Sequence, residues 1–304
     1  MRAVAAVILA TLAACDLVDG SAVPTDAAID AVATDAYRPP RGDVVPAVGS
    51  ATTLDVACWN IENFPATTNT PTYVADLITS LDLDVVVVEE IASIAAWREL
   101  LDRLPAYAGV LSTHAYTPTS YQKIGLIYRA GLVSVGTPEL LFVTDTYAFP
   151  RPPFRVPVTV GALTVDVIGV HLKAGVEADD ADRRAAAARS LDAYLRAQVA
   201  GAGDPDFVVL GDYNETITTA DGAMVLGPLL APDAYRMRTA EVAASGAASF
   251  IPSGKVIDHI LTSAALATLA GDRAAVIPPL DEQFPGYLGA VSDHLPVVLS
   301  IPGP

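Results

Sequence analysis

Short apolar runs alternate with longer amphipathic segments over most of this chain, and this alternation constrains the fold more than any other feature. Runs of four to eight apolar residues predict strands, and they fall at 54–59, 84–88, 124–128, 163–170, 207–210, 256–261 and 296–301. Helical periodicity predicts helices at 72–80, 94–104 and 179–199, and segments 112–120, 142–153 and 278–292 are predicted to be loops. The alternation predicts a mixed α/β domain.

The first fifteen residues, MRAVAAVILATLAAC, have the organisation of a secretory signal. A single Arg2 precedes an apolar run, which is too short to span a bilayer as a helix. The closing Leu-Ala-Ala-Cys resembles a bacterial lipobox, which implies cleavage after residue 14 and acylation of Cys15. The alternative is an ordinary signal that happens to end near a cysteine. We therefore expect an exported chain that a lipid anchors to the bacterial cell envelope, at the periplasmic face or the cell surface.

Residues 15–50 are rich in Ala, Asp and Pro and show no steady period, so we expect a flexible tether ahead of a domain at 51–304. The chain has two cysteines, which excludes a disulfide framework. Cys58 lies in an apolar run and is predicted to be a core residue.

The chain is strongly acidic, with a net charge of -17. Residues 1–15 contribute +1 and residues 16–50 contribute -4, which leaves -14 for residues 51–304. Proteins that hold nucleic acid mainly through Lys and Arg are usually basic. The domain must therefore recruit cations, avoid polyanions or offset its charge at one local site.

Polar side chains follow or precede five of the predicted strands directly, where loops can host a site. They are Asn60 and Glu62, Glu90, His171, Asp212 with Asn214, and Asp293 with His294. A single Asp at a strand end is more often a turn or cap residue. Five such ends carrying Asn, Glu, His and Asp predict one shared rim.

The residue types at this rim indicate a cation and proton transfer. Clustered carboxylates repel one another unless a cation lies among them, and oxygen ligands favour Mg²⁺, Mn²⁺ or Ca²⁺. Histidine can accept and return a proton near neutral pH. A lone histidine in an apolar segment is more often a hydrogen-bonded core residue, and we expect this of His114 and His259.

Six motifs resemble those of endonuclease/exonuclease/phosphatase proteins and occur in the order of that superfamily. They are DVACWNIENF (55–64), DVVVVEEI (84–91), VDVIGVHLKAG (165–175), VVLGDYNE (208–215), KVIDHIL (255–261) and VSDHLPVV (291–298). The superfamily includes pancreatic-type deoxyribonuclease, abasic-site endonucleases, bacterial sphingomyelinases and inositol polyphosphate phosphatases. The resemblance covers essentially all of 51–304 and implies a four-layer α/β/β/α sandwich, in which two mixed sheets pack between helices.

The resemblance also implies roles for particular residues. Glu90 would be the principal ligand of Mg²⁺ or Mn²⁺, with Asn60, Glu62 and Asp293 nearby. His294 would be the general base, oriented by Asp258, and Asp212 and Asn214 would position the water or the phosphate. His171 would contact the phosphate and is a candidate general acid; its orienting partner would be Gln122. Arg151 and Arg155 would bind phosphate, with solvated loop positions as the alternative.

Two positions depart from the superfamily pattern. Glu89 stands where a glutamine is common and would add a negative charge near the metal, and Glu62 is one methylene longer than the Asp of abasic endonucleases.

Family membership constrains the mechanism more than the substrate. We expect a monomeric metal-dependent hydrolase, first of all a nuclease that cleaves DNA or RNA. A sphingomyelinase-like enzyme acting on phospholipid head groups or small phosphate esters is the alternative; the aromatic residues Tyr147, Phe149, Phe284 and Tyr287 would then contact lipid. The third hypothesis is a catalytically silent binding lipoprotein.

Overall fold

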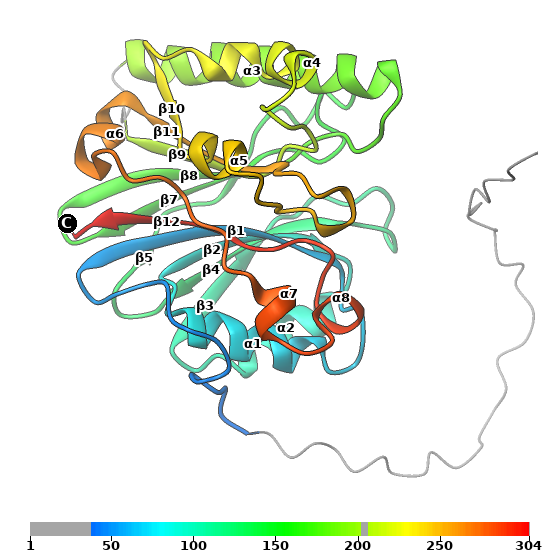
Figure 1. The fold of residues 1–304 in the computed structure, drawn as a ribbon, viewed down its shortest axis with the longest axis vertical. Helices are drawn as coiled ribbons and strands as arrows, with labels where there is room; N and C mark the ends of the chain where they lie inside the picture. Colours follow the sequence, from blue (N-terminus) through cyan, green and yellow to red (C-terminus); the bar gives the residue numbers. More distant parts are fainter. Residues whose placement is uncertain (1–37, 202–205, 304) are drawn as a thin grey trace, which may run out of the picture. The chain divides into compact units, whose positions relative to one another are not determined.

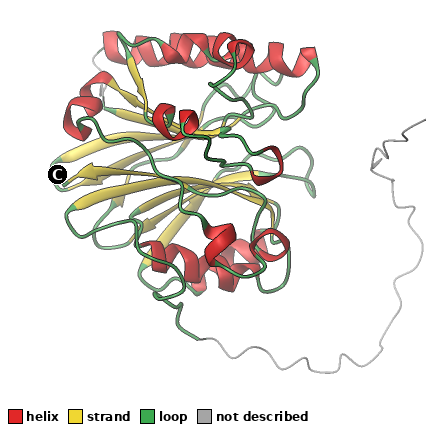
Figure 2. Cartoon of the chain, in the orientation of Figure 1, coloured by secondary structure: helices red, strands yellow, loops and turns green. Residues whose placement is uncertain are grey.

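The structure, a computed structural model, describes residues 38–201 and 206–303, in which two β-sheets pack face to face between layers of helices (Figures 1 and 2). This arrangement confirms the predicted four-layer α/β/β/α sandwich. The predicted signal segment 1–14 and Cys15 lie outside the described residues. Within the described part, no helix is both long enough and apolar enough to cross a membrane.

The first sheet is built around the parallel strands β1 (Thr53–Phe64) and β2 (Val85–Ile91). Parallel neighbours need a crossover connection, and α1 (Thr70–Leu81) supplies it. Three antiparallel strands complete the sheet: β3 (Tyr107–Leu111), β4 (Lys123–Arg129) and β12 (Val297–Pro302). The strand order is β12-β1-β2-β4-β3.

The second sheet repeats this plan around the parallel strands β8 (Leu163–His171) and β9 (Phe207–Asp212), which α3 (Ala178–Ala200) connects. The other strands are β5 (Ser134–Val135), β6 (Glu139–Leu140), β7 (Phe154–Val160), β10 (Tyr235–Met237) and β11 (Asp258–Ser263). They give the order β10-β11-β9-β8-β7-β5, and β6 also pairs with β7.

Helices cover the outer face of each sheet (Figure 1). The first sheet is covered by α1, α2 (Ile94–Asp102), α7 (Leu280–Gln283) and α8 (Tyr287–Ala290). The second is covered by α3, α4 (Ala220–Val225) and the 3₁₀ turn η1 (Gly227–Leu230). The connections carry α5 (Ala240–Ala244), the 3₁₀ turn η2 (Ile251–Ser253) and α6 (Ala264–Ala270).

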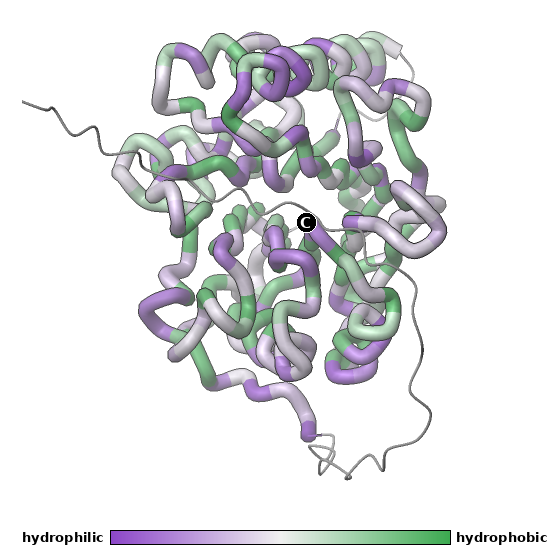
Figure 3. The backbone as a smooth tube through the Cα atoms, turned by 90° about the vertical axis from the view of Figure 1, so that its right-hand side faces the viewer, coloured by the Kyte–Doolittle hydropathy of each residue, from purple (hydrophilic) through white to green (hydrophobic). Residues whose placement is uncertain are grey.

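One apolar core lies beneath the helices of each sheet, and a third lies between the two sheets. This third core consists largely of β-branched residues from both inner faces. Strands buried on both faces read as continuous apolar runs, which explains the clarity of the signal at 84–88 and 207–210. Cys58 is fully buried in this core, as predicted. Figure 3 shows hydrophobic stretches along the central strands, whereas hydrophobic and hydrophilic stretches alternate along the outer helices, which have one buried and one exposed face.

All seven predicted strands and all three predicted helices are present, with ends shifted by a few residues. Five further strands and the short helices within 278–292 carry no clear sequence signal. Strand β7 contains Pro157 and follows Pro152 and Pro153, a composition that argues against a strand inside a sheet. Pro157 is tolerated because it takes part in the sheet pairing as an acceptor. Its carbonyl accepts a hydrogen bond from the Gly136 N–H, and this bond does not need the N–H that proline lacks.

Residues 38–49, which the composition assigned to the tether, lie along α1. The buried Asp76 carboxylate of α1 accepts two hydrogen bonds from the Arg38 guanidinium, at 2.8 and 2.6 Å, and one from the Arg41 backbone N–H. Val45 is buried, and Gly49 donates to the Leu81 carbonyl at the end of α1. The folded part therefore begins by Arg38 rather than at residue 51, because this segment completes the surface of α1.

Candidate active site

The carboxyl ends of the two parallel strand pairs meet at one edge of the sandwich, opposite the edge at which the chain ends (Figure 1). Parallel strands bring their carboxyl ends to the same side, and β8 places His171 beside Asp212 in register. The loops after β1 and β2 and the segment before β12 reach the same edge. Most of the polar residues that the sequence singled out are therefore brought together.

His294 and Asp258 form a buried pair at the centre of this edge. The His294 Nδ1 lies 2.9 Å from Asp258 Oδ2, and that same oxygen accepts a 2.6 Å hydrogen bond from the Ser249 hydroxyl. The carboxylate accepts the Nδ1–H, so Nε2 is the nitrogen that faces the other site residues. It lies 3.8 Å from Asp293 Oδ1 and 4.0 Å from Asp212 Oδ2.

The carboxylates around His294 control its charge. Burial lowers the pKa of His294, but Asp258, Asp212 and Asp293 outweigh burial and raise it to about 10. The pKa of Asp212 is also raised, to about 7, but here burial is the main cause and the Asp258 charge adds to it. In the absence of other charges, this cluster therefore holds a proton on His294.

Asp212 links His294 to the other half of the site. Its Oδ2 accepts a 3.1 Å hydrogen bond from Asn60 Nδ2 and lies 3.5 Å from His171 Nε2, while Oδ1 accepts a 2.7 Å bond from the Asn214 backbone. His171 is buried, and its Nδ1 has no partner among the described residues. Burial, and then the Arg151 charge, hold the pKa of His171 well below its usual value. The His171 ring is therefore neutral.

An acidic rim borders this cluster and consists of Glu62, Glu90 and Asp293. Glu90 accepts hydrogen bonds from Asn60 Nδ2 at 3.3 Å and from the Asn63 backbone at 2.9 Å. Burial, and then Asp293, raise the pKa of Glu62. Burial also raises the pKa of Asp293, and the Glu90 charge adds to this effect although His294 opposes it. The three carboxylates are thus crowded and carry more negative charge than their surroundings neutralise.

Four residues of this edge have left-handed backbone conformations, which are uncommon outside glycine. Their φ angles are 41° at Glu62, 43° at Asn63, 64° at Glu90 and 51° at Asn214. Strained backbone tends to accumulate at functional sites. Here it turns the ends of β1, β2 and β9 so that their polar side chains converge.

The donor set of the rim fits a hard divalent cation. Glu90, Glu62 and Asp293 offer only oxygen ligands, the type that Mg²⁺ and Mn²⁺ prefer, and their mutual repulsion would fall on cation binding. The Asn60 amide oxygen lies beside them and accepts a hydrogen bond from the Glu62 backbone N–H. Among the described residues, it is Asp212, Asp258 and His294, and not the rim carboxylates, that bring three ligand atoms within 4.8 Å of one another. That trio is a poorer cation site, because Asp258 already accepts hydrogen bonds from His294 and Ser249.

Glu89 faces the space between the sheets and not the rim. It is fully buried, and neither carboxyl oxygen has a partner in the described part of the chain. Burial, and then Asp258 and Asp212, raise the pKa of Glu89 well above its usual value. The side chain is therefore a neutral acid, so the expected extra negative charge near the metal is not present.

The two predicted phosphate-binding arginines are used elsewhere. The Arg151 guanidinium is buried beside the site but donates to the carbonyls of His171 and Leu172 and to Gln122. Arg155 lies outside the cluster and forms ion pairs with Glu139 at 3.2 Å and Asp166 at 2.8 Å. The sequence could not reveal this, because these partners lie on neighbouring strands.

Gln122 does not orient His171 in this structure. Its Oε1 accepts from Arg151 and Tyr116, and its Nε2 donates to Asn63 Oδ1 at 2.8 Å. His259 is a satisfied core residue, as expected: it contacts Thr239 Oγ1 at 2.7 Å and the Glu215 carbonyl at 2.9 Å. Burial lowers the pKa of His259 to about 4.

Three residues that sequence reasoning missed hold the His294 segment. Ser249 orients Asp258, as described above. The Tyr287 hydroxyl donates to the His294 carbonyl at 2.5 Å and accepts from Trp59 Nε1 at 3.0 Å. Ser292 is the third of these residues, and its position directly before Asp293 and His294 was its only signal in the sequence. Tyr287 was named only as a possible lipid contact. The contacts of both residues depend on segments distant in the sequence.

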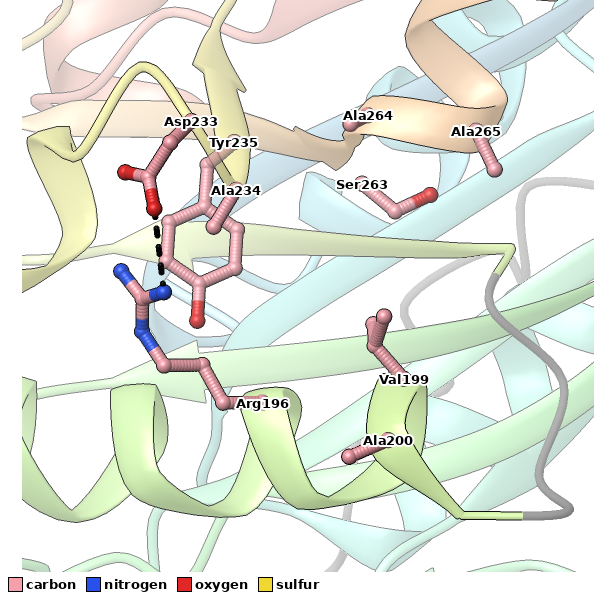
Figure 4. Close-up of a pocket in the computed structure, with 9 residues that line it drawn as sticks. All are labelled: Arg196, Val199, Ala200, Asp233, Ala234, Tyr235, Ser263, Ala264 and Ala265. Atoms are coloured by element: carbon pink, nitrogen blue, oxygen red, sulfur yellow. Dashed lines mark hydrogen bonds and ion pairs between the residues drawn. The ribbon is translucent and has the colours of Figure 1, made fainter.

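Two cavities differ in their relation to this cluster. One of about 380 Å³ adjoins it and is lined by Asn214, Phe250 and Lys255, among others. The other, of about 290 Å³, lies between the end of α3, β10 and the start of α6 (Figure 4). It is mostly apolar, and the 3.3 Å ion pair of Arg196 with Asp233 forms part of its wall. None of the predicted site residues lines the second cavity.

The sandwich and the buried acid–histidine cluster at its edge define a hydrolytic enzyme of the phosphoesterase or nuclease class. The profile of the Endonuclease/Exonuclease/phosphatase family matches residues 57–294, and the chain belongs to this family. No curated protein matches the chain.

Solved structures with the same fold are distant in sequence. D. rerio TDP2 in complex with a single-strand DNA product has a TM-score of 0.58 and 15% identity, over 82% of this chain and 98% of that one. The human Nocturnin catalytic domain with a bound sulfate anion has a TM-score of 0.59 and 16% identity, over 86% and 98%. The 3' phosphatase NExo from Neisseria, bound to a product DNA hairpin, has a TM-score of 0.60 and 17% identity, over 82% and 99%. At these identities the similarity shows the fold alone.

Proposed function

We propose that this chain is a divalent-cation-dependent phosphodiesterase that hydrolyses DNA or RNA, and that a lipid on Cys15 anchors it to the bacterial cell envelope after export. The observation that carries the catalytic half is the His294–Asp258 pair, whose Nε2 faces Asp212 beside the acidic rim. The anchoring half is supported by the sequence of residues 1–15.

His294 is the proposed general base. Asp258 holds the ring through Nδ1, so Nε2 can accept a proton from the attacking water. Asp212 and Asn214 position that water or the phosphate. The hydrogen bond from Asn60 holds the Asp212 carboxylate in place for this role. His171 is neutral and contributes a hydrogen bond to the phosphate or the leaving oxygen.

Glu90, Glu62, Asp293 and Asn60 would hold the cation. When bound, Mg²⁺ or Mn²⁺ would polarise the phosphoryl oxygens and offset the carboxylate charge that keeps His294 protonated. The same requirement agrees with the overall acidity of the domain, because an acidic site must bind a cation before it can accept a phosphate.

Nucleic acid is favoured as the substrate because two of the similar structures hold DNA products. The lipid alternative loses part of its support, since two of its four aromatic residues, Phe149 and Tyr287, are buried in the cores and cannot contact a membrane surface, although Tyr147 is exposed. The silent-binding alternative is disfavoured by the complete set of base, orienting carboxylate and acidic rim.

The test is a plasmid-nicking assay with Mg²⁺, Mn²⁺ or EDTA, run beside sphingomyelin and bis(p-nitrophenyl) phosphate. We expect nicking that requires a divalent cation and stops with EDTA. Hydrolysis of sphingomyelin without cleavage of DNA or RNA would overturn the proposed substrate, and no hydrolysis of any phosphodiester would overturn the enzyme itself.

A further inference from the structure

A polyanionic substrate needs a cationic side chain that can contact it, and the guanidinium groups of the two predicted arginines are both engaged by protein groups. Arg151 is held by backbone carbonyls and Gln122, and Arg155 by two carboxylates. A strand of nucleic acid carries one phosphate per nucleotide, so its phosphates extend past the scissile one. A second phosphate therefore needs a counter-charge from another part of the site.

Lys255 is the lysine of this chain that is free to provide it. The sequence has three lysines. Lys123 is buried and donates to the His114 carbonyl, and Lys173 forms a 2.7 Å ion pair with Asp180. Lys255 is exposed, and its ammonium group has no ion pair or hydrogen bond with any described residue.

The backbone places Lys255 close to His294 through Phe250. Phe250 forms antiparallel bridges with both Lys255 and His294, and its ring lies 4.7 Å from the His294 ring. Each bridge separates paired Cα atoms by about 5 Å. The turn between Phe250 and Lys255 is closed by Gly254 at φ 64°, so the position of the Lys255 backbone is fixed.

The cavity of about 380 Å³ beside the cluster connects these residues. Asn214, Phe250 and Ile257 line it together with Lys255. Arg184 and Glu215 also line it, but they form a 3.0 Å ion pair with each other, so the lysine is the lining cation that no carboxylate neutralises. A substrate group next to the scissile phosphate would enter this cavity. Its own phosphate would then come within reach of the lysine side chain.

We propose that Lys255 binds a phosphate adjacent to the scissile one and thereby selects a polynucleotide strand over an isolated phosphodiester; this inference rests on the proposed phosphodiesterase function. Lys255 contributes to substrate binding and not to proton transfer. Its loss therefore weakens binding of a strand and leaves turnover of a single phosphodiester unchanged.

The experiment compares Lys255→Ala and Lys255→Arg with the wild type on an oligonucleotide and on bis(p-nitrophenyl) phosphate, over a range of salt concentrations. Arg189→Ala is the matched control, because Arg189 is an exposed cation on α3. We expect Lys255→Ala to raise KM for the oligonucleotide about tenfold, as loss of one charge-assisted contact implies, with little change in kcat. The slope of log(kcat/KM) against log salt should become shallower by about 0.7, the value for one phosphate contact on a single strand.

Lys255→Arg should retain most of the affinity, and bis(p-nitrophenyl) phosphate should be hydrolysed equally by all variants. Equal KM values and salt slopes for Lys255→Ala and Arg189→Ala would overturn the inference alone. An equal loss on bis(p-nitrophenyl) phosphate would also overturn it, since the effect would then lie in the chemistry. A wild type that cleaves no oligonucleotide would overturn both this inference and the proposed substrate.

Discussion

The buried hydroxyl of Ser292 donates a 2.7 Å hydrogen bond to the backbone carbonyl of Asn60. The same oxygen accepts a 2.9 Å bond from the His294 backbone N–H. One side chain thus fixes the distance between the strand that carries part of the acidic rim and the segment that carries the proposed base.

Ser292→Ala should lower kcat by about 10–100-fold, because two buried backbone groups lose their partner at a cost of about 1–3 kcal/mol and the base shifts relative to the rim. Ser300→Ala is the control. Ser300 lies at the other end of β12 and donates to the buried Asp55, so it removes a similar bond far from the site. Both variants should have a lower Tm, and only Ser292→Ala should lose activity; equal kcat values for the two would contradict the positioning role.

His294→Ala should reduce kcat on any phosphodiester by about 10²–10⁴-fold, the usual contribution of a proton-transfer residue, without loss of the circular dichroism spectrum. Asp258→Asn should give a loss of similar direction, because the amide cannot hold the same tautomer. His114→Ala serves as the control, since the His114 Nε2 has no partner in the described structure. Near-normal turnover of His294→Ala would show that another group activates the water.

Glu90→Gln should raise the Mn²⁺ concentration for half-maximal activity by at least about tenfold, because it removes one charge from the proposed ligand set. Isothermal titration with Mn²⁺ in the absence of substrate measures the same effect independently of catalysis. Glu99→Gln is the control, because it removes one negative charge from α2, where Glu99 forms an ion pair with Arg103. Unaltered Mn²⁺ affinity of Glu90→Gln would place the cation elsewhere.

Glu89→Gln should stabilise the protein increasingly as pH rises. Burial raises the pKa of Glu89 in the folded state, so the protein must keep a proton that the unfolded chain releases above about pH 4.3. Each further pH unit then costs up to about 1.4 kcal/mol until the folded pKa is reached. Thermal unfolding in EDTA should show equal Tm values near pH 4 and a higher Tm for Glu89→Gln at pH 8. A pH-independent difference would mean that Glu89 is not a neutral acid.

Cys15→Ser should abolish labelling of the protein by a radioactive fatty acid in the bacterial host, because the acylated thiol is removed. The protein should then be recovered in a soluble fraction of the envelope or the medium. Cys58→Ser is the control, since Cys58 is buried in the core and cannot accept a lipid. Equal labelling of the Cys15→Ser variant would contradict the proposed anchor.

The sequence predicted the layered fold because its central strands are buried on both faces and its polar residues cluster at strand ends. It also predicted the residues that converge, from Asn60 to His294, since their positions follow from strand direction alone. The proline-containing strand β7 and the short edge strand β10 were not predicted, because short or proline-containing segments depend on their neighbours for stability.

What the sequence could not provide is the pairing of side chains across distant segments. Arg155 had the composition of a phosphate ligand, but Glu139 and Asp166 take up its charge. Glu89 read as an added negative charge, but its direction into the inter-sheet core makes it neutral. Lys255 begins the KVIDHIL motif, but its position in the sequence does not show that the bridges of Phe250 and a shared cavity bring it to the site.

The segment 38–49 along α1 determines where this enzyme can be cut without harm. A protease that cleaves directly ahead of Arg38 would leave intact the contacts that residues 38–49 make with α1. Cleavage after Gly49 would instead remove both donors of the nearly inaccessible Asp76 carboxylate and uncover the groove that Val45 fills. A carboxylate left without partners in that position destabilises the folded state. A difference of a dozen residues in the cleavage position thus separates a domain that keeps its fold from one that starts to unfold.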